Sequence, residues 1–211
     1  MKEIKNFVWD FDGTLFDTYP VIIDTVRKTL QEFGYDCDPK EAMQLLLENL
    51  AYTREHYAEK FGIDRDQLRQ VNQRHWKEAF EKLTSKPMEG VEQVLKTICA
   101  ASKRNYVFTN RDCAGTYNHL QKYGLADCFQ DIMGQDSEGF AWKPAPDALL
   151  FLMEKHGLDP EETVMIGDRL CDLESGRGAG TKTAHILCQM APENLQCDWR
   201  LEDYRQMLEL L

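Results

Sequence analysis

FVWDFDGTLFDT, residues 7–18, places three aspartates directly behind a short apolar run. The apolar run, residues 4–9, predicts a buried strand, and Asp10 and Asp12 follow that strand at its carboxyl end. Gly13 comes next, a residue that lets the backbone turn sharply and approach a ligand closely. Two carboxylates about 4 Å apart repel by about 4 kcal/mol at an effective dielectric constant near 20, so we expect a cation beside them.

Two different sequence patterns follow this strand along the chain. Residues 20–83 carry apolar side chains at a spacing of three to four and predict helices, with no convincing strand among them. After Gly90, predicted strands alternate with predicted helices, which is typical of parallel β-α-β units. Those strands are expected at residues 105–110, 131–134, 163–168 and 182–187. The amphipathic segment 194–211 is interpreted as an edge strand or loop followed by a docking helix.

The pattern predicts an α/β fold with a doubly wound, open parallel sheet and an inserted all-helical cap. One strand precedes about 70 helical residues, and the rest of the α/β pattern comes after them, so the core must be discontinuous. We expect the core at residues 1–16 and 86–211 and the cap domain at residues 17–85.

Composition and charge indicate which partners and which cellular compartment to expect. The chain has 211 residues, is 43% hydrophobic and carries a net charge of -11, which disfavours nucleic acid and anionic membranes. No apolar run approaches the roughly 20 residues of a membrane span, and MKEIKNF lacks an apolar signal region. The seven cysteines show no Cys-x-x-Cys spacing, so we expect reduced thiols, no zinc site and a cytoplasmic protein. An oligomeric partner is not indicated.

Polar residues follow several of the predicted strands, and in an open parallel sheet these strand ends meet at the ligand-binding edge. All-oxygen ligands favour a hard cation, so we expect Mg²⁺ there. One carboxylate can attack phosphorus and a second can move the proton, while a hydroxyl, an amide and an ammonium orient phosphoryl oxygens. The converging residues are Asp10, Asp12, Thr109, Asn110, Lys143, Asp168 and Asp172.

Four motifs occur in order: D-x-D-G-T at residues 10–14, an apolar strand ending at Thr109, Lys143-Pro144, and G-D-x-x-x-D at residues 167–172. Together they resemble the haloacid dehalogenase superfamily of aspartate-nucleophile phosphotransferases. The predicted cap is similar to that of phosphoglycolate phosphatase and β-phosphoglucomutase relatives. Dehalogenating members lack the second aspartate, so Asp12 indicates phosphoryl chemistry.

The resemblance implies a role for each motif residue. Asp10 would be the nucleophile and a Mg²⁺ ligand, and Asp12 would be the acid/base and a ligand through its carbonyl. Asp168 would bind the metal, and Asp172 would orient metal waters or Lys143. Gly13, Thr14, Thr109, Asn110 and Arg111 are candidates for phosphate contact, although an ion pair is an equal alternative for Arg111. A loop between cap helices would select the substrate, with Asn49, Tyr52, Thr53 and Arg54 as its candidates and an ordinary helix linker as the alternative.

We therefore expect a Mg²⁺-dependent phosphatase that hydrolyses a small phosphorylated metabolite through an aspartyl-phosphate. A sugar-phosphate mutase would share the intermediate and return the phosphoryl group to a hydroxyl instead of water. A non-catalytic binding protein on the same scaffold ranks last, because Asp10, Asp12 and Lys143 are all present.

Overall fold

The chain forms two compact units in a computed structural model that describes residues 2–137, 139–187 and 195–210. One unit is Met1–Asp17 with Pro87–Leu211, and the other is Thr18–Lys86. The domain boundaries predicted from the sequence lie one residue from these positions. Two short strands, β2 (Phe16–Asp17) and β3 (Lys86–Pro87), form a separate two-stranded sheet where the chain passes from one unit to the other.

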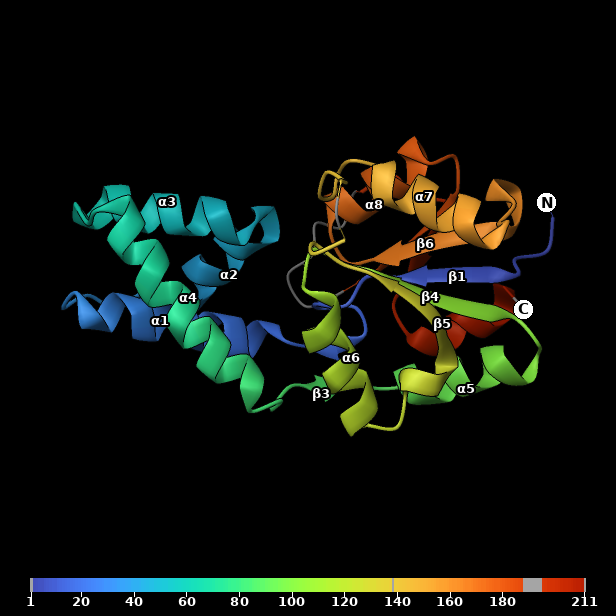
Figure 1. The fold of residues 1–211 in the computed structure, drawn as a ribbon, viewed down its shortest axis with the longest axis horizontal. Helices are drawn as coiled ribbons and strands as arrows, with labels where there is room; N and C mark the ends of the chain where they lie inside the picture. The colour runs from blue at the N-terminus through green and yellow to red at the C-terminus, as the bar shows by residue number, and fades with distance from the viewer. Residues whose placement is uncertain (1, 138, 188–194, 211) are drawn as a thin grey trace. The chain divides into compact units, whose positions relative to one another are not determined.

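The larger unit is built on a six-stranded sheet with the order β5-β4-β1-β6-β7-β8 (Figure 1). Every neighbouring pair is parallel. The chain adds strands on one side of β1 and then crosses to add strands on the other, so the sheet is doubly wound, as predicted. The strands are β1 (Asn6–Trp9), β4 (Arg104–Phe108), β5 (Phe129–Met133), β6 (Thr163–Gly167), β7 (Lys182–Ile186) and β8 (Trp199–Leu201).

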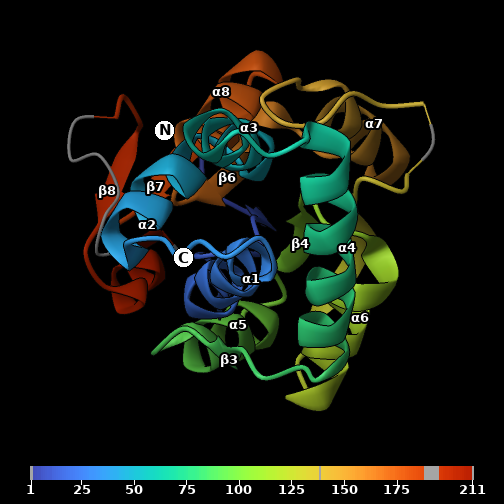
Figure 2. The ribbon, with the colours of Figure 1, turned by 90° about the vertical axis from the view of Figure 1, so that its left-hand side faces the viewer.

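Helices cover both faces of this sheet (Figures 1 and 2). On one face lie α5 (Val91–Ala100) and α6 (Cys113–Lys122), and on the other lie α7 (Asp147–His156) and α8 (Leu170–Gly178). The C-terminal 3₁₀ helix η3 (Tyr204–Leu210) packs on the α5 face, after the edge strand β8. Two further 3₁₀ turns are η1 (Ala126–Cys128) and η2 (Pro160–Glu162).

Strand β1 shows why the sheet needs helices on both faces. All four of its residues are buried, as expected for a central parallel strand. Phe7 and Trp9 enter the hydrophobic core under α5, whereas Val8 enters the separate core under α7. Successive side chains of a strand point to opposite faces, so an apolar run without alternation supplies both cores.

The smaller unit contains four helices, α1 (Tyr19–Glu32), α2 (Pro39–Glu48), α3 (Leu50–Phe61) and α4 (Arg65–Glu81) (Figure 2). Each of the last three begins at an Asp or Asn whose side chain accepts a backbone N–H, which satisfies a donor that the helix leaves open. The apolar faces of the helices meet in one core, which includes Val26, Leu30, Tyr57 and Leu68. Among the described residues, no helix is long and apolar enough to cross a membrane.

The loop predicted at residues 49–54 is wrong as secondary structure, because Asn49 alone separates α2 from α3. Asn49 Oδ1 accepts the Tyr52 N–H at 2.7 Å, so this side chain starts a new helix immediately. Thr53 is buried, and its hydroxyl donates to the Asn49 carbonyl at 2.9 Å. Arg54 donates to Asn72 at 3.4 Å, and burial lowers the pKa of its guanidinium. Tyr52 is 48% exposed, and Asn49 is exposed as well.

Candidate active site

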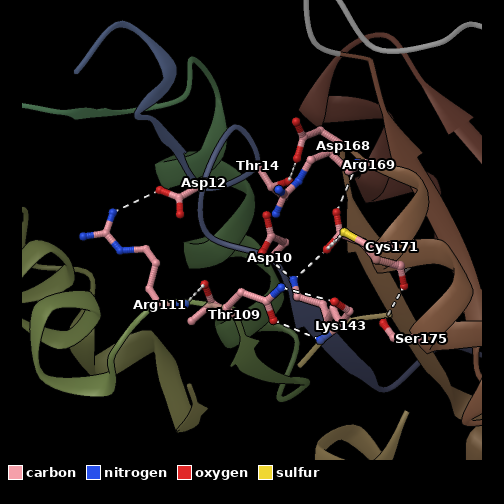
Figure 3. A network of polar contacts seen from close by, with 12 residues as sticks. Asp10, Asp12, Thr14, Thr109, Arg111, Lys143, Asp168, Arg169, Cys171 and Ser175 are labelled. Carbon is pink, nitrogen blue, oxygen red and sulfur yellow. Dashed lines mark hydrogen bonds and ion pairs between the residues drawn. The ribbon is translucent and has the colours of Figure 1, made fainter. Parts of the chain in front are cut away.

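The carboxyl ends of three adjacent strands hold the predicted site residues (Figure 3). Asp10 follows β1, Thr109 follows β4 and Asp168 follows β6, and β1 pairs with both of the other strands. The Asp10 N–H donates to the Ile166 carbonyl at 2.8 Å, so the ladder holds the first aspartate in register. The position agrees with the rule that open α/β sheets bind ligands where the strand order reverses.

Lys143 joins two of the predicted carboxylates. Its Nζ lies 2.5 Å from Asp10 Oδ1 and 2.6 Å from Asp172 Oδ1, and its side chain is fully buried. Burial by itself lowers the pKa of Lys143, but the two carboxylates outweigh burial and the pKa is raised. Lys143 is therefore a charged ammonium shared by two acids.

The side-chain amide of Asn110 forms hydrogen bonds with the main chain of Lys143. Asn110 Oδ1 accepts the Lys143 N–H at 3.0 Å, and Asn110 Nδ2 donates to the Lys143 carbonyl at 3.4 Å. The sequence predicts Asn110 as a phosphate contact, whereas both ends of its amide hydrogen-bond to the main chain of Lys143. Thr109 is buried and its hydroxyl accepts the Arg111 N–H at 3.2 Å.

Asp172 caps the start of helix α8 as well as holding Lys143. Its Oδ2 accepts the Arg169 N–H at 3.1 Å, which satisfies a backbone donor at the start of the helix. Gly167 explains the glycine of G-D-x-x-x-D, because a Cβ atom there would lie 2.3 Å from the Asp172 Cβ. Any side chain at residue 167 would thus displace the carboxylate that positions Lys143.

A divalent cation fits the carboxylates at this edge. Asp10, Asp168 and Asp172 are buried, and one oxygen of each lies within 4.8 Å of the others. In the part of the chain that the structure describes, Asp10 Oδ2 is buried without a hydrogen-bond partner, and it therefore has lone pairs available for an ion. Burial and then Asp172 raise the pKa of Asp10 to about 7, against the lowering effect of Lys143. A cation would favour the ionised carboxylate, and an all-oxygen donor set suits Mg²⁺.

Asp12 and Arg111 form an ion pair apart from these carboxylates (Figure 3). Arg111 Nη1 donates to Asp12 Oδ1 at 3.0 Å, and the arginine is 4% exposed. The guanidinium carbon also lies 4.7 Å from the centre of the Phe11 ring. Gly13, which follows Asp12 directly, has a φ of +76°, a conformation that favours glycine. Of the two alternatives for Arg111, the structure contains the ion pair.

Three further residues lie near the site; the sequence predicts Cys171 as a small filler inside the fourth motif, and it does not single out His185 or Tyr204. The His185 imidazole lies 3.1 Å, through Nε2, from the Asp168 carbonyl, and the Tyr204 hydroxyl donates to the Thr14 carbonyl. Cys171 Sγ lies 3.9 Å from Asp172 Oδ1, and burial raises the thiol pKa to about 12, which keeps it protonated. His185 and Tyr204 reach the site from β7 and η3, so no local motif marks them.

Comparison with known proteins gives the family. The family model described as haloacid dehalogenase-like hydrolase matches residues 7–186. The chain belongs to this family. The match includes all four motifs, and it confirms the resemblance and the prediction of a hydrolase of this family.

Members of the family with 27–30% identity to this chain have different named substrates. An N-acetylmuramic acid 6-phosphate phosphatase from Pseudomonas aeruginosa is 30% identical and covers 93% of this chain and 88% of its own length. A phosphoglycolate phosphatase from Vibrio vulnificus is 30% identical, with coverage of 85% and 82%. Pyrophosphatase PpaX from Listeria welshimeri is 27% identical, with coverage of 99% and 97%.

Solved structures agree with the fold. A predicted phosphoglycolate phosphatase from Haemophilus somnus superposes with a TM-score of 0.87 at 19% identity, covering 100% of this chain and 99% of that one. A family hydrolase from Deinococcus radiodurans, solved with bound phosphate and sodium, has a TM-score of 0.80 at 19% identity and covers 97% and 93%. At these identities the similarity establishes the doubly wound core with a helical insertion.

Proposed function

We propose that this hydrolase is a Mg²⁺-dependent phosphatase of a small phosphorylated metabolite that works through an aspartyl-phosphate. The observation that supports it most is the environment of Asp10. Its Oδ1 contacts Lys143, and its Oδ2, buried beside Asp168 and Asp172, has no hydrogen-bond partner among the described residues. The relatives named as phosphatases support the same reaction class.

In the first half-reaction, a carboxylate oxygen of Asp10 attacks phosphorus, and the bond from phosphorus to the leaving oxygen breaks. Asp12 donates a proton to that oxygen, so the product leaves as a neutral alcohol. In the second half-reaction, a water oxygen attacks the phosphorus of the aspartyl-phosphate while Asp12 takes the water proton. Inorganic phosphate and the Asp10 carboxylate are released.

Lys143 would stabilise the carboxylate before attack and the phosphoryl oxygens during it, since its ammonium is already desolvated and oriented. A bound Mg²⁺ would be held by Asp10 and Asp168, with Asp172 beside them, and would neutralise negative charge on the phosphoryl group. The direct metal contact of Asp12, the phosphate contacts of Gly13, Thr14 and Thr109, and a specificity role for residues 49–54 stay predictions.

A phosphate-release screen tests the proposed function. Sugar phosphates, phosphoglycolate, nucleotides, pyrophosphate and an aryl phosphate would be incubated with enzyme and Mg²⁺, and free phosphate measured. Turnover of at least one monoester is expected. A sugar phosphate that is isomerised without phosphate release would identify a mutase, and a complete lack of activity against the panel would exclude the proposal.

Removing Mg²⁺ is expected to abolish this activity reversibly, because the buried carboxylates would then repel each other and the phosphoryl group. Added Mg²⁺ should also raise the thermal midpoint, since an ion that binds the folded state alone stabilises it. Asp168→Asn should lose both responses, whereas Asp127→Asn, at an exposed acid of the same unit, should keep them. Equal midpoints of wild type with and without Mg²⁺ would count against a metal site here.

Arg111→Met is expected to lower kcat by about tenfold while KM changes little, because the variant loses the group that holds the Asp12 carboxylate. The measurement is steady-state phosphate release at saturating Mg²⁺. Arg111→Lys should recover part of the loss. A large rise in KM with kcat unchanged would instead identify Arg111 as a substrate contact.

A further inference from the structure

The C-terminal segment reaches the loop that holds the nucleophile. The Tyr204 hydroxyl, from helix η3, donates a hydrogen bond to the Thr14 carbonyl across 190 positions of sequence. Tyr204 is 6% exposed and Thr14 is fully buried, so water does not compete freely for this carbonyl. Both residues belong to the α/β unit.

Thr14 extends this contact to a predicted metal ligand. Its hydroxyl donates to Asp168 Oδ1 at 3.1 Å, and its carbonyl accepts from Tyr204 (Figure 3 shows the Thr14–Asp168 bond). A phenol from η3, the loop after β1 and the carboxylate after β6 are therefore connected by two consecutive hydrogen bonds. Hydrogen bonds that orient metal-binding carboxylates are known to tune metal affinity.

Two other carbonyls of this stretch accept backbone N–H groups. The Phe11 carbonyl accepts the N–H groups of Leu15 and Phe16 at 3.0 Å, and the Phe16 carbonyl accepts from Gly13 at 2.9 Å. The Thr14 carbonyl, by contrast, receives a side-chain donor from the far end of the chain. Without the Tyr204 hydroxyl, the buried Thr14 carbonyl would lack a donor. The loop would then have to shift for this carbonyl to form another hydrogen bond.

Packing keeps the tyrosine ring in place independently of its hydroxyl. Tyr204 and Met207 belong to the hydrophobic core under α5, and Met207 is fully buried. Tyr204 Cβ also lies 3.4 Å from the position that a Cβ of Gly90 would occupy. A phenylalanine can therefore replace Tyr204 with the ring retained, and the substitution tests the hydroxyl alone.

We propose that Tyr204 is a positioning residue for the reaction, which fixes Thr14 and through it the relation between the nucleophile loop and Asp168. The proposal rests on the proposed function, because it assumes that this loop carries the nucleophile and that Asp168 binds the metal. It gives the last helix a part in positioning the site, in addition to its packing in the core under α5.

The test compares Tyr204→Phe with Tyr106→Phe. Tyr106 is a matched control because it is fully buried in β4, in the core under α7 on the opposite face of the sheet. For Tyr204→Phe we expect kcat on an aryl phosphate and Mg²⁺ affinity, measured by calorimetry, to fall by about tenfold to a hundredfold. KM should stay near that of Tyr106→Phe, whereas the thermal midpoint in chelator should be lower than that of Tyr106→Phe, because the buried Thr14 carbonyl loses its donor.

A double-mutant cycle adds a second readout. If Tyr204 acts through Thr14, adding Tyr204→Phe to Thr14→Val should lower kcat and Mg²⁺ affinity by much less than it does in wild type. Equal kcat and Mg²⁺ affinity in Tyr204→Phe and Tyr106→Phe, or a lower midpoint alone, would overturn the positioning role while leaving the proposed function intact. Wild-type enzyme that neither hydrolyses phosphate esters nor binds Mg²⁺ would overturn both.

Discussion

Asp10→Asn should abolish turnover, with kcat lower by roughly 10⁴-fold or more, because an amide oxygen does not attack phosphorus as a carboxylate does. The change is nearly isosteric, and Lys143 keeps its contact with Asp172 at 2.6 Å, so the protein should remain folded. The measurement is phosphate release under the conditions that give maximal wild-type activity, together with the thermal midpoint.

Asp17→Asn is the matched control for this substitution. Asp17 is an exposed acid in the same stretch of sequence, and its replacement should leave kcat close to wild type. In chelator, Asp10→Asn should be at least as stable as wild type, since it removes a buried carboxylate that Asp172 repels. Turnover by Asp10→Asn within a factor of ten of wild type would contradict a nucleophilic role.

Lys143→Met should damage both stability and catalysis, because it leaves Asp10 and Asp172 buried without their shared ammonium. Breaking a buried ion pair by removing one partner costs about 3–5 kcal/mol of unfolding free energy. The loss of a pre-oriented cation should also lower kcat by about 10²–10³-fold. Urea unfolding in chelator and phosphate release in Mg²⁺ measure the two effects.

The stability loss in Lys143→Met should grow with pH. In the folded protein the pKa of Asp10 is raised to about 7 from an ordinary value of 3.8, first by burial and then by Asp172, and removing Lys143 raises it further. A raised carboxyl pKa means that the folded state binds more protons, so the variant loses stability as pH rises through and beyond this range. Unfolding at about pH 5 and about pH 8 should show the larger deficit at the higher pH.

Lys155→Met provides the control for this second substitution. Lys155 pairs with Asp131 at 2.7 Å, but its side chain is 49% exposed. An exposed ion pair contributes about 0–1 kcal/mol, so little change is expected at either pH. A Lys143→Met protein as stable as Lys155→Met, with unchanged kcat, would show that the buried ammonium is not needed.

Much of the site could be predicted because each motif is local. Asp10, Thr109 and Asp168 each follow an apolar run that was interpreted as a strand, and parallel strands place their carboxyl ends at one edge. The contacts of Asn110 and Arg111 were not predictable in the same way. Asn110 holds Lys143, which is 33 positions away, and Arg111 pairs with Asp12, which is 99 positions away.

In the helical segment, by contrast, a prediction failed although its signal was local. Residues 49–54 were interpreted as a loop between helices, although Asn49 is a favourable helix N-cap followed by residues compatible with a helix. The capping side chain allowed α3 to begin one residue after α2 ended. The capping signal at Asn49 is therefore local and sufficient to predict this turn.

The stretch at residues 7–18 was sufficient to predict a buried strand, a glycine turn and a pair of acids, because strand periodicity and turn geometry depend on neighbouring residues. The partners of those acids depend on the order of strands in the sheet, which an apolar pattern does not encode. Folding brings Lys143 to Asp10, Arg111 to Asp12 and Tyr204 to Thr14. Buried charges and carbonyls need such partners, and only the packed sheet brings residues so distant in sequence close enough to supply them.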